Sequence, residues 1–281
     1  WVSWRFVEEP VRRAQRLPGF AVLGGTALAS VILLGVGGVL FTRDGVPGRF
    51  GQDAAVHIAA SGDFLQDWSR CRAPTDGPLM GLDVCPIGPE GEPEVLIWVD
   101  SHLRAFREGL ALAADEAQTP AIILWRAGCP PLFGIRKSES AATMAQDTAC
   151  TQANTQIKQA LGRLDSVETV LLVGRWSYYA SGTGVGLDAG NTISVRPVDL
   201  SEIATQSQAQ IVARAARRTV EDLRGWFDTV FVLQQPPELP AYASRKAARE
   251  AAHAGWPLAA RPVTRDSVDR LVRIAFAGPF G

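Results

Sequence analysis

Short apolar runs alternate with longer amphipathic stretches from residue 94 to the end of the chain. The runs predict strands, and the stretches between and after them predict helices. The strands are expected at 95–99, 121–125, 170–173 and 229–233, and the helices at 103–114, 141–164, 202–227, 241–254 and 265–276. Such alternation with short connections favours right-handed crossovers. We therefore expect an α/β fold of three layers with a mostly parallel sheet.

A different apolar pattern lies near the start of the chain. No charged residue occurs from 20 to 41, and as a helix of about 1.5 Å per residue this run covers roughly 33 Å, enough to cross a bilayer core of about 30 Å. A cleaved signal peptide is the alternative, although its apolar region is normally only about 7–15 residues long. Arg12, Arg13 and Arg16 precede the run, and the positive-inside rule places them in the cytoplasm. We therefore expect a transmembrane helix with residues 43–281 on the outer side.

Charge and cysteine content narrow the class of protein. The chain has 281 residues and a net charge of -1, which gives no support for nucleic-acid binding. Its four cysteines lie between Cys71 and Cys150 and form no cluster with histidines at metal-ligand spacing, so we expect no metal. Beyond a bacterial cytoplasmic membrane disulfides persist, and four cysteines allow three pairings. Four buried thiols are the alternative.

Candidate chemistry begins where the first predicted strand ends, at Asp100-Ser101-His102. In parallel sheets ligands bind at the carboxyl ends of the strands, and the helix expected from residue 103 begins just after the serine. A helix N-terminus offers free N–H groups and a positive dipole end, which suit a serine nucleophile and the oxyanion that it produces. The alternative is that Asp100 and Ser101 only cap this helix.

The next two predicted strands also end in residues that suit a site. The second is followed by a loop that two prolines hold in a tight turn, Ala127-Gly128-Cys129-Pro130-Pro131-Leu132. The third is followed by Gly174-Arg175-Trp176-Ser177. An ordinary turn, and an Arg and a Trp packed on the rim of the sheet, are the alternatives.

Taken in order, these motifs resemble the SGNH (GDSL-type) hydrolase family, whose first block is usually Gly-Asp-Ser. Asp100-Ser101-His102 is similar to that block, with Val99 in the place of the Gly. The other two motifs resemble the branch of the family that is fused to membrane acyltransferases. The broader family's Asn in the third block is missing, and Asn154 is a poor substitute because it lies mid-helix by pattern. Glu8-Glu9-Pro10 resembles the end of the last core helix of the acyltransferase family 3 membrane domain.

The resemblance implies a domain order. Residues 1–19 would end a membrane acyltransferase domain, 20–41 would be the transmembrane helix, 42–93 a periplasmic linker and lead-in, and 94–281 a flavodoxin-like SGNH domain that is incomplete at its C-terminus. The implied location is the bacterial inner membrane, with the C-terminal domain in the periplasm.

The resemblance also implies a function, the O-acylation, often O-acetylation, of a cell-envelope glycan such as lipopolysaccharide or a peptidoglycan sugar. Membrane lipid and the envelope polysaccharide would be the partners. Acyl-CoA, usually acetyl-CoA, would be the donor for the missing membrane domain, and this part of the protein would bind no cofactor. A periplasmic acyl esterase and a non-catalytic glycan-binding domain are the alternatives.

The resemblance assigns roles to the residues at the strand ends. Ser101 would be the nucleophile, and the N–H of Gly128 would serve the oxyanion hole. Arg175 would contact the oxyanion or the substrate, and Trp176 would offer a stacking face for a sugar. Asp100 and His102 are not expected to be the acid–base pair, because on a strand–helix turn their side chains should diverge from the serine hydroxyl. They are expected to bind substrate. The pattern of the family further implies two disulfides, Cys71–Cys85 and Cys129–Cys150.

The catalytic base is the least evident part of the site. An SGNH site needs a late Asp-x-x-His block whose His deprotonates the serine. Glu250-x-x-His253 is a formal variant, but a solvated face of an Ala-rich helix explains these two residues better. His57 lies in the linker. We therefore expect this chain to lack its base and to be inactive by itself.

Overall fold

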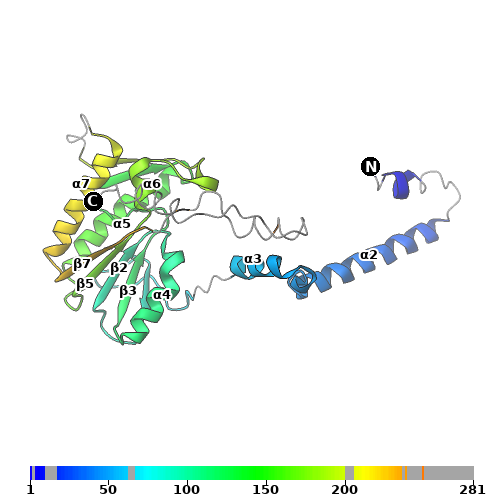
Figure 1. Ribbon diagram of the computed structural model, residues 1–281, viewed down its shortest axis with the longest axis horizontal. Coiled ribbons are helices and arrows are strands. Elements are labelled where there is room, and N and C mark those ends of the chain that lie inside the picture. The colour runs from blue at the N-terminus through cyan, green and yellow to red at the C-terminus, as the bar shows by residue number, and fades with distance from the viewer. Residues whose placement is uncertain are drawn as a thin grey trace. The chain divides into compact units, whose positions relative to one another are not determined.

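A five-stranded sheet forms the centre of the computed structural model, which describes residues 1, 4–9, 18–62, 67–199, 206–235, 238 and 249. The strand order is β1-β3-β2-β5-β7 (Figure 1). The strands are β1 (Val84–Ile87), β2 (Val95–Val99), β3 (Ala121–Trp125), β5 (Thr169–Val173) and β7 (Thr229–Leu233). All neighbours run parallel except β1, which is antiparallel to β3. The expected α/β fold with a mostly parallel sheet is confirmed.

Helices cover both faces of this sheet, as the strand–helix alternation predicted. On one face, α5 (Met144–Leu161) and α7 (Gln208–Arg224) pack on side chains such as Leu96, Leu124 and Leu172. On the other face, α4 (Leu103–Glu116) packs on a second cluster that includes Ile97 and Ile123. Strands buried on both faces require near-continuous apolar runs, which explains why β2, β3 and β5 were recognisable in the sequence.

The N-terminal ends of α5 and α7 are set by capping boxes. Thr143 and Gln146 exchange side-chain and backbone hydrogen bonds at the start of α5, and Ser207 and Gln210 do the same for α7. Each box satisfies N–H groups that have no partner within the helix. The predicted helix at 141–164 therefore started too early, because apolar periodicity alone does not show where the first turn is capped.

The edge strand β1 was not predicted, since it lies in the segment expected to be a lead-in. It is only four residues long and contains Pro86, which cannot donate to a ladder and is tolerated at an edge. Residues just before it are attached to the sheet as well. Arg72 pairs with Val84 through two backbone hydrogen bonds, and Cys71 forms a disulfide with Cys85. The lead-in therefore contributes to the sheet from residue 71 onward.

A second, two-stranded antiparallel sheet consists of β4 (Ile135–Glu139) and β6 (Ile193–Pro197). Its residues alternate between buried and exposed, with Ile135 and Lys137 on the buried side of β4. The short helices α6 (Trp176–Ser181) and η3 (Gly186–Asp188) lie between β5 and β6 in the chain. None of these elements was predicted, because each is only three to six residues long and mixes apolar with polar or charged residues.

The N-terminal residues form a unit of their own, described here by itself. It contains η1 (Trp4–Glu8), α2 (Gly19–Thr42), η2 (Pro47–Arg49) and α3 (Gln52–Gly62). Helix α2 is apolar around its whole circumference, and none of its residues is buried. It is long and apolar enough to cross a membrane, and a signal sequence has the same properties. The expected apolar helix is confirmed, whereas the helices expected at 241–254 and 265–276 lie outside the described residues.

Candidate active site

Three loops meet at the carboxyl edge of the sheet because three strands end level with one another. Val99 at the end of β2 lies opposite Trp125 of β3 and Val173 of β5. The segments that follow, from Asp100, Arg126 and Gly174, therefore leave the sheet side by side. Carboxyl edges of parallel strands are where such folds bind ligands.

Ser101 lies in the turn between β2 and α4, where its side chain is exposed. The N-cap residue of α4 is His102, and its own side chain makes no capping hydrogen bond. Of the two alternative caps, Asp100 accepts the N–H of His102 at the start of the helix, whereas Ser101 does not act as a cap. Among the described residues, neither the hydroxyl nor the N–H of Ser101 has a hydrogen-bond partner. Both groups are available to a substrate at this edge.

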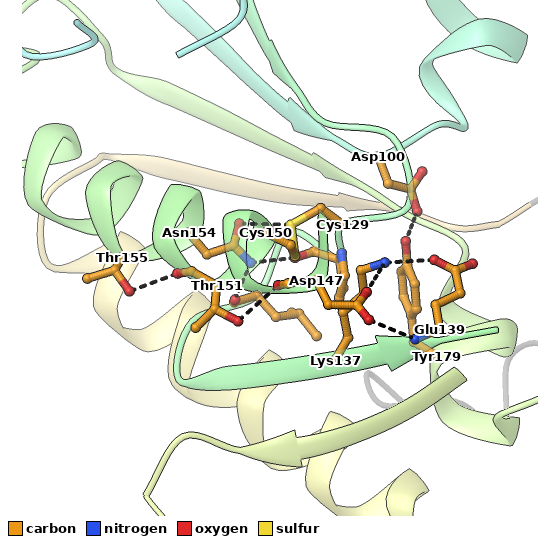
Figure 2. The surroundings of a disulfide bond; sticks show 12 residues. Asp100, Cys129, Lys137, Glu139, Asp147, Cys150, Thr151, Asn154, Thr155 and Tyr179 are labelled. Carbon is orange, nitrogen blue, oxygen red and sulfur yellow. Dashed lines mark hydrogen bonds and ion pairs between the residues drawn. A yellow bond between two sulfur atoms is a disulfide. The ribbon is translucent and has the colours of Figure 1, made fainter. Parts of the chain in front are cut away.

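Asp100 is fully buried and holds two of the loops together. Its carboxylate accepts hydrogen bonds from the N–H of His102 (2.7 Å) and the N–H of Arg175 (2.8 Å). It also accepts one from the hydroxyl of Tyr179, which Figure 2 shows. Burial, together with the charge of Asp100, raises the pKa of Tyr179 well above its usual range, so the phenol remains a donor. We therefore assign Asp100 to positioning the site and no longer to binding substrate.

The imidazole of His102 turns back toward this buried carboxylate. Its Nδ1 lies 3.3 Å from Oδ1 of Asp100, and 20% of the side chain is exposed. The two atoms are close enough for an ion pair when the ring is protonated, but they are not aligned for a hydrogen bond. Divergence of this side chain from the Ser101 hydroxyl and substrate binding by His102 both stay predictions.

Gly128 occupies a loop that is held from several sides. Its φ is +64°, a conformation that favours glycine. The N–H of Arg126 donates to the carbonyl of Val99 at 3.1 Å, and Cys129 forms the second disulfide with Cys150 of α5. Asn154, in the middle of α5 as the pattern indicated, donates to the carbonyls of Pro130 (2.8 Å) and Leu132 (3.0 Å). The loop is therefore rigid before any ligand binds.

The N–H of Gly128 forms no hydrogen bond within the described part of the chain. It lies on the loop after β3, beside the loop that carries Ser101. Donors that converge on one point stabilise an oxyanion, and the N–H groups of Ser101 and Gly128 are the candidates for this role. Both predicted disulfides, Cys71–Cys85 and Cys129–Cys150, are confirmed, and the latter fixes the residue after Gly128.

Arg175 is held by carboxylates. Its Nε and Nη2 donate to the two carboxylate oxygens of Glu238 at 2.8 and 2.7 Å, and its Nη1 lies 3.1 Å from Asp188. These hydrogen bonds and charges raise the pKa of Arg175 despite its burial, so it stays positively charged. A contact of Arg175 with an oxyanion or substrate stays a prediction. Its two carboxylate partners, Asp188 and Glu238, were not expected from the sequence.

Trp176 is a core residue. It is 3% exposed, and its indole N–H donates to the carbonyl of Leu233 at 2.9 Å. The ring also packs against Gly174, where an added Cβ would lie 3.0 Å from it. A ring enclosed in this way offers no face to a sugar. We therefore correct the expectation of a stacking surface and assign Trp176 to fixing the loop after β5.

The ion pair of Arg175 with Glu238 predicts a pH dependence of stability. Burial would raise the pKa of Glu238, but hydrogen bonds and charge from Arg175 outweigh it, so the pKa lies below its usual value of about 4.3. A carboxyl with a lowered pKa stabilises the folded state above that usual value and loses this contribution as the pH falls through the lowered pKa. Glu238→Gln should therefore reduce the free energy of unfolding by about 1–2 kcal/mol at pH 7.

Urea unfolding followed by tryptophan fluorescence between pH 3 and pH 7 measures this difference. The difference in free energy of unfolding between the wild type and Glu238→Gln should disappear as the pH falls below about 4. A gap that stays constant over this range would contradict the assignment.

Glu250 and His253, the formal acid–base pair, lie outside the described residues. Among the described residues, no group of three or more His, Cys, Asp or Glu side chains is placed to hold a metal ion. Lys137 and Glu139 lie beside Gly128, and Asp147 pairs with Lys137; none of the three was expected from the sequence. Nothing in the sequence pointed to them, because the residues of β4 look like an ordinary charged surface segment.

A family model described as "SGNH domain (fused to AT3 domains)" matches residues 70–278. The match begins well before residue 94, where the sequence analysis placed the start of the domain, and it includes β1 and both disulfides. No curated protein sequence and no solved structure matches the chain.

Proposed function

The chain belongs to the family of SGNH domains that are fused to AT3 domains, and from this we propose that it transfers acyl groups, typically acetyl, to a hydroxyl of a cell-envelope glycan. SGNH domains carry out hydrolysis and acyl transfer, and the fused membrane domain favours transfer. The observation that carries the proposal is the exposed Ser101 at the carboxyl edge of the sheet, with the N–H of Gly128, which has no partner among the described residues, on the neighbouring loop.

The proposed reaction proceeds in two steps. In the first, Oγ of Ser101 bonds to the acyl carbonyl carbon, and the bond to the donor group breaks. In the second, the glycan hydroxyl attacks the same carbon and releases Ser101. The N–H groups of Ser101 and Gly128 would stabilise the tetrahedral oxyanion in each step, each donor contributing about 2.7–4 kcal/mol.

Each step also moves one proton. A general base takes it from the attacking hydroxyl and returns it to the leaving group. In the SGNH family this base is the His of a late Asp-x-x-His block, which this chain is expected to lack. Glu250 and His253 are the alternative pair, and His102 is turned toward Asp100.

The proposal is tested in the intact protein, with the AT3 domain to which SGNH domains of this family are fused, by expressing it in cells that lack it and feeding them labelled acetate. Envelope glycan is purified and treated with mild alkali, and the ester-linked acetate that is released is counted. We expect label on the glycan only when the protein is present. Label that is released to water without reaching the glycan would identify an esterase, and glycan binding without any turnover would identify a binding domain.

We further propose that α2 spans the inner membrane with Arg12, Arg13 and Arg16 inside and residues 43–281 outside. The length and apolar surface of α2 support a span, and two disulfides suit an oxidising compartment. Alkaline phosphatase fused after Gly281 should be active, and a green fluorescent protein fused at the same place should be dark. The reverse pattern would contradict this topology, and a mature N-terminus after residue 42 would identify a cleaved signal sequence.

A further inference from the structure

A buried lysine lies beside the Gly128 loop and has no part in the reaction as described. Lys137 points inward from β4 with 3% of its side chain exposed. Its Nζ lies 2.7 Å from a carboxylate oxygen of Glu139 and 3.0 Å from one of Asp147 in α5 (Figure 2). Removing an ammonium group from water is costly unless it is paired, so this position is occupied only because both carboxylates surround it.

The ion pair of Lys137 with Glu139 touches the candidate oxyanion loop. A Cβ added to Gly128 would lie 3.0 Å from Oε2 of Glu139 and 3.5 Å from Nζ of Lys137. Two features therefore favour glycine at position 128: its positive φ, and the close approach of the Lys137–Glu139 ion pair. An oxyanion held by the N–H of Gly128 would have the carboxylate of Glu139 as a near neighbour.

Glu139 is also fixed from the side of the third loop. The hydroxyl of Tyr178 donates to its Oε1 at 3.0 Å. Burial, with the charge of Glu139, raises the pKa of Tyr178, so this hydroxyl stays protonated and remains a donor. The carboxylate is therefore held beside Gly128 and cannot swing away when negative charge develops there.

From this geometry we infer that Lys137 is a positioning residue that neutralises Glu139 next to the oxyanion. Without the ammonium group, the carboxylate would oppose the charge that forms on the acyl carbonyl oxygen, and it would do so in a buried region where water screens charges poorly. The inference rests on the proposed function, because it assumes that the oxyanion forms against Gly128. A merely structural role of Lys137, tying β4 to α5, is the competing explanation.

A double-mutant cycle separates the two explanations. The label on glycan is measured as an initial rate in cells that contain equal amounts of the wild type, Lys137→Met, Glu139→Gln and the double variant. We expect Lys137→Met to slow transfer at least about tenfold, because an unpaired carboxylate then faces the oxyanion. Glu139→Gln should stay within about threefold of the wild type, and the double variant within about threefold of Glu139→Gln.

Three controls make the outcome decisive. Lys158→Met removes an exposed lysine that is also paired with a carboxylate, Asp222, and it should leave the rate unchanged. Near-UV circular dichroism of each chain purified in detergent shows whether it is folded. Ser101→Ala, measured in the same series, shows whether the label depends on the nucleophile at all.

A folded double variant that is as slow as Lys137→Met would overturn the inference, and so would a Lys137→Met variant as fast as the wild type. If Lys137→Met does not fold, the transfer rate of the double variant is compared with that of Glu139→Gln. Equal rates support the charge role of Lys137, and a double variant that is tenfold slower refutes it. Equal label from the wild type and Ser101→Ala would instead refute the proposed function, and the inference would fall with it.

Discussion

Ser101→Ala is expected to abolish transfer of acyl groups to the glycan, by about a thousandfold or more. Alanine has no nucleophilic atom, so the acyl-enzyme cannot form, and donors that stabilise an oxyanion cannot replace the missing bond. The free energy of unfolding should change by less than about 0.5 kcal/mol, because Ser101 is exposed and its hydroxyl has no partner among the described residues. The measurement is the alkali-released label on purified glycan, with urea unfolding of the same variant.

The matched control is Ser194→Ala, which removes an exposed serine hydroxyl from β6. It should leave both the label and the stability unchanged. If Ser101→Ala places as much label on the glycan as the wild type does, Ser101 is not the nucleophile. A large loss of stability with this variant would mean that the serine supports the fold.

The second large effect is expected from Asp100→Ala. The change leaves three donors without an acceptor, the N–H groups of His102 and Arg175 and the buried hydroxyl of Tyr179. Each unsatisfied buried donor costs about 1–3 kcal/mol, so we expect a loss of about 3–5 kcal/mol in the free energy of unfolding. Transfer should also fall at least about tenfold in molecules that remain folded, because the loops after β2 and β5 are no longer joined.

Two variants accompany this experiment. Asp100→Asn keeps one carbonyl oxygen as an acceptor and should lose less stability than Asp100→Ala. Asp115→Ala removes an exposed carboxylate from α4 and should change the free energy of unfolding by less than about 0.5 kcal/mol. Urea unfolding followed by tryptophan fluorescence measures all three. Equal stabilities of Asp100→Ala and Asp115→Ala would show that Asp100 does not join the loops.

The sequence by itself determined the fold class, the main strands and the order of the site motifs. Apolar runs such as Val95–Val99 and the uncharged run from residue 20 to 41 are local signals, because a strand buried on both faces and an apolar helix each leave a continuous pattern. Ser101 and Gly128 could be found because each lies within three residues of the end of such a run. The disulfide pairs followed from the resemblance, and the structure confirms them.

Only the tertiary structure decided which polar and aromatic side chains face the solvent. Asp100 and Trp176 were both expected to meet substrate, and both are buried. Lys137 was not considered from the sequence, and Asp147, ten residues further along the chain, helps to make its burial possible. Arg175 is likewise held by Glu238, 63 residues away. Burial of a charge depends on partners that are distant in the sequence, whereas apolar periodicity reports only on an element's own faces.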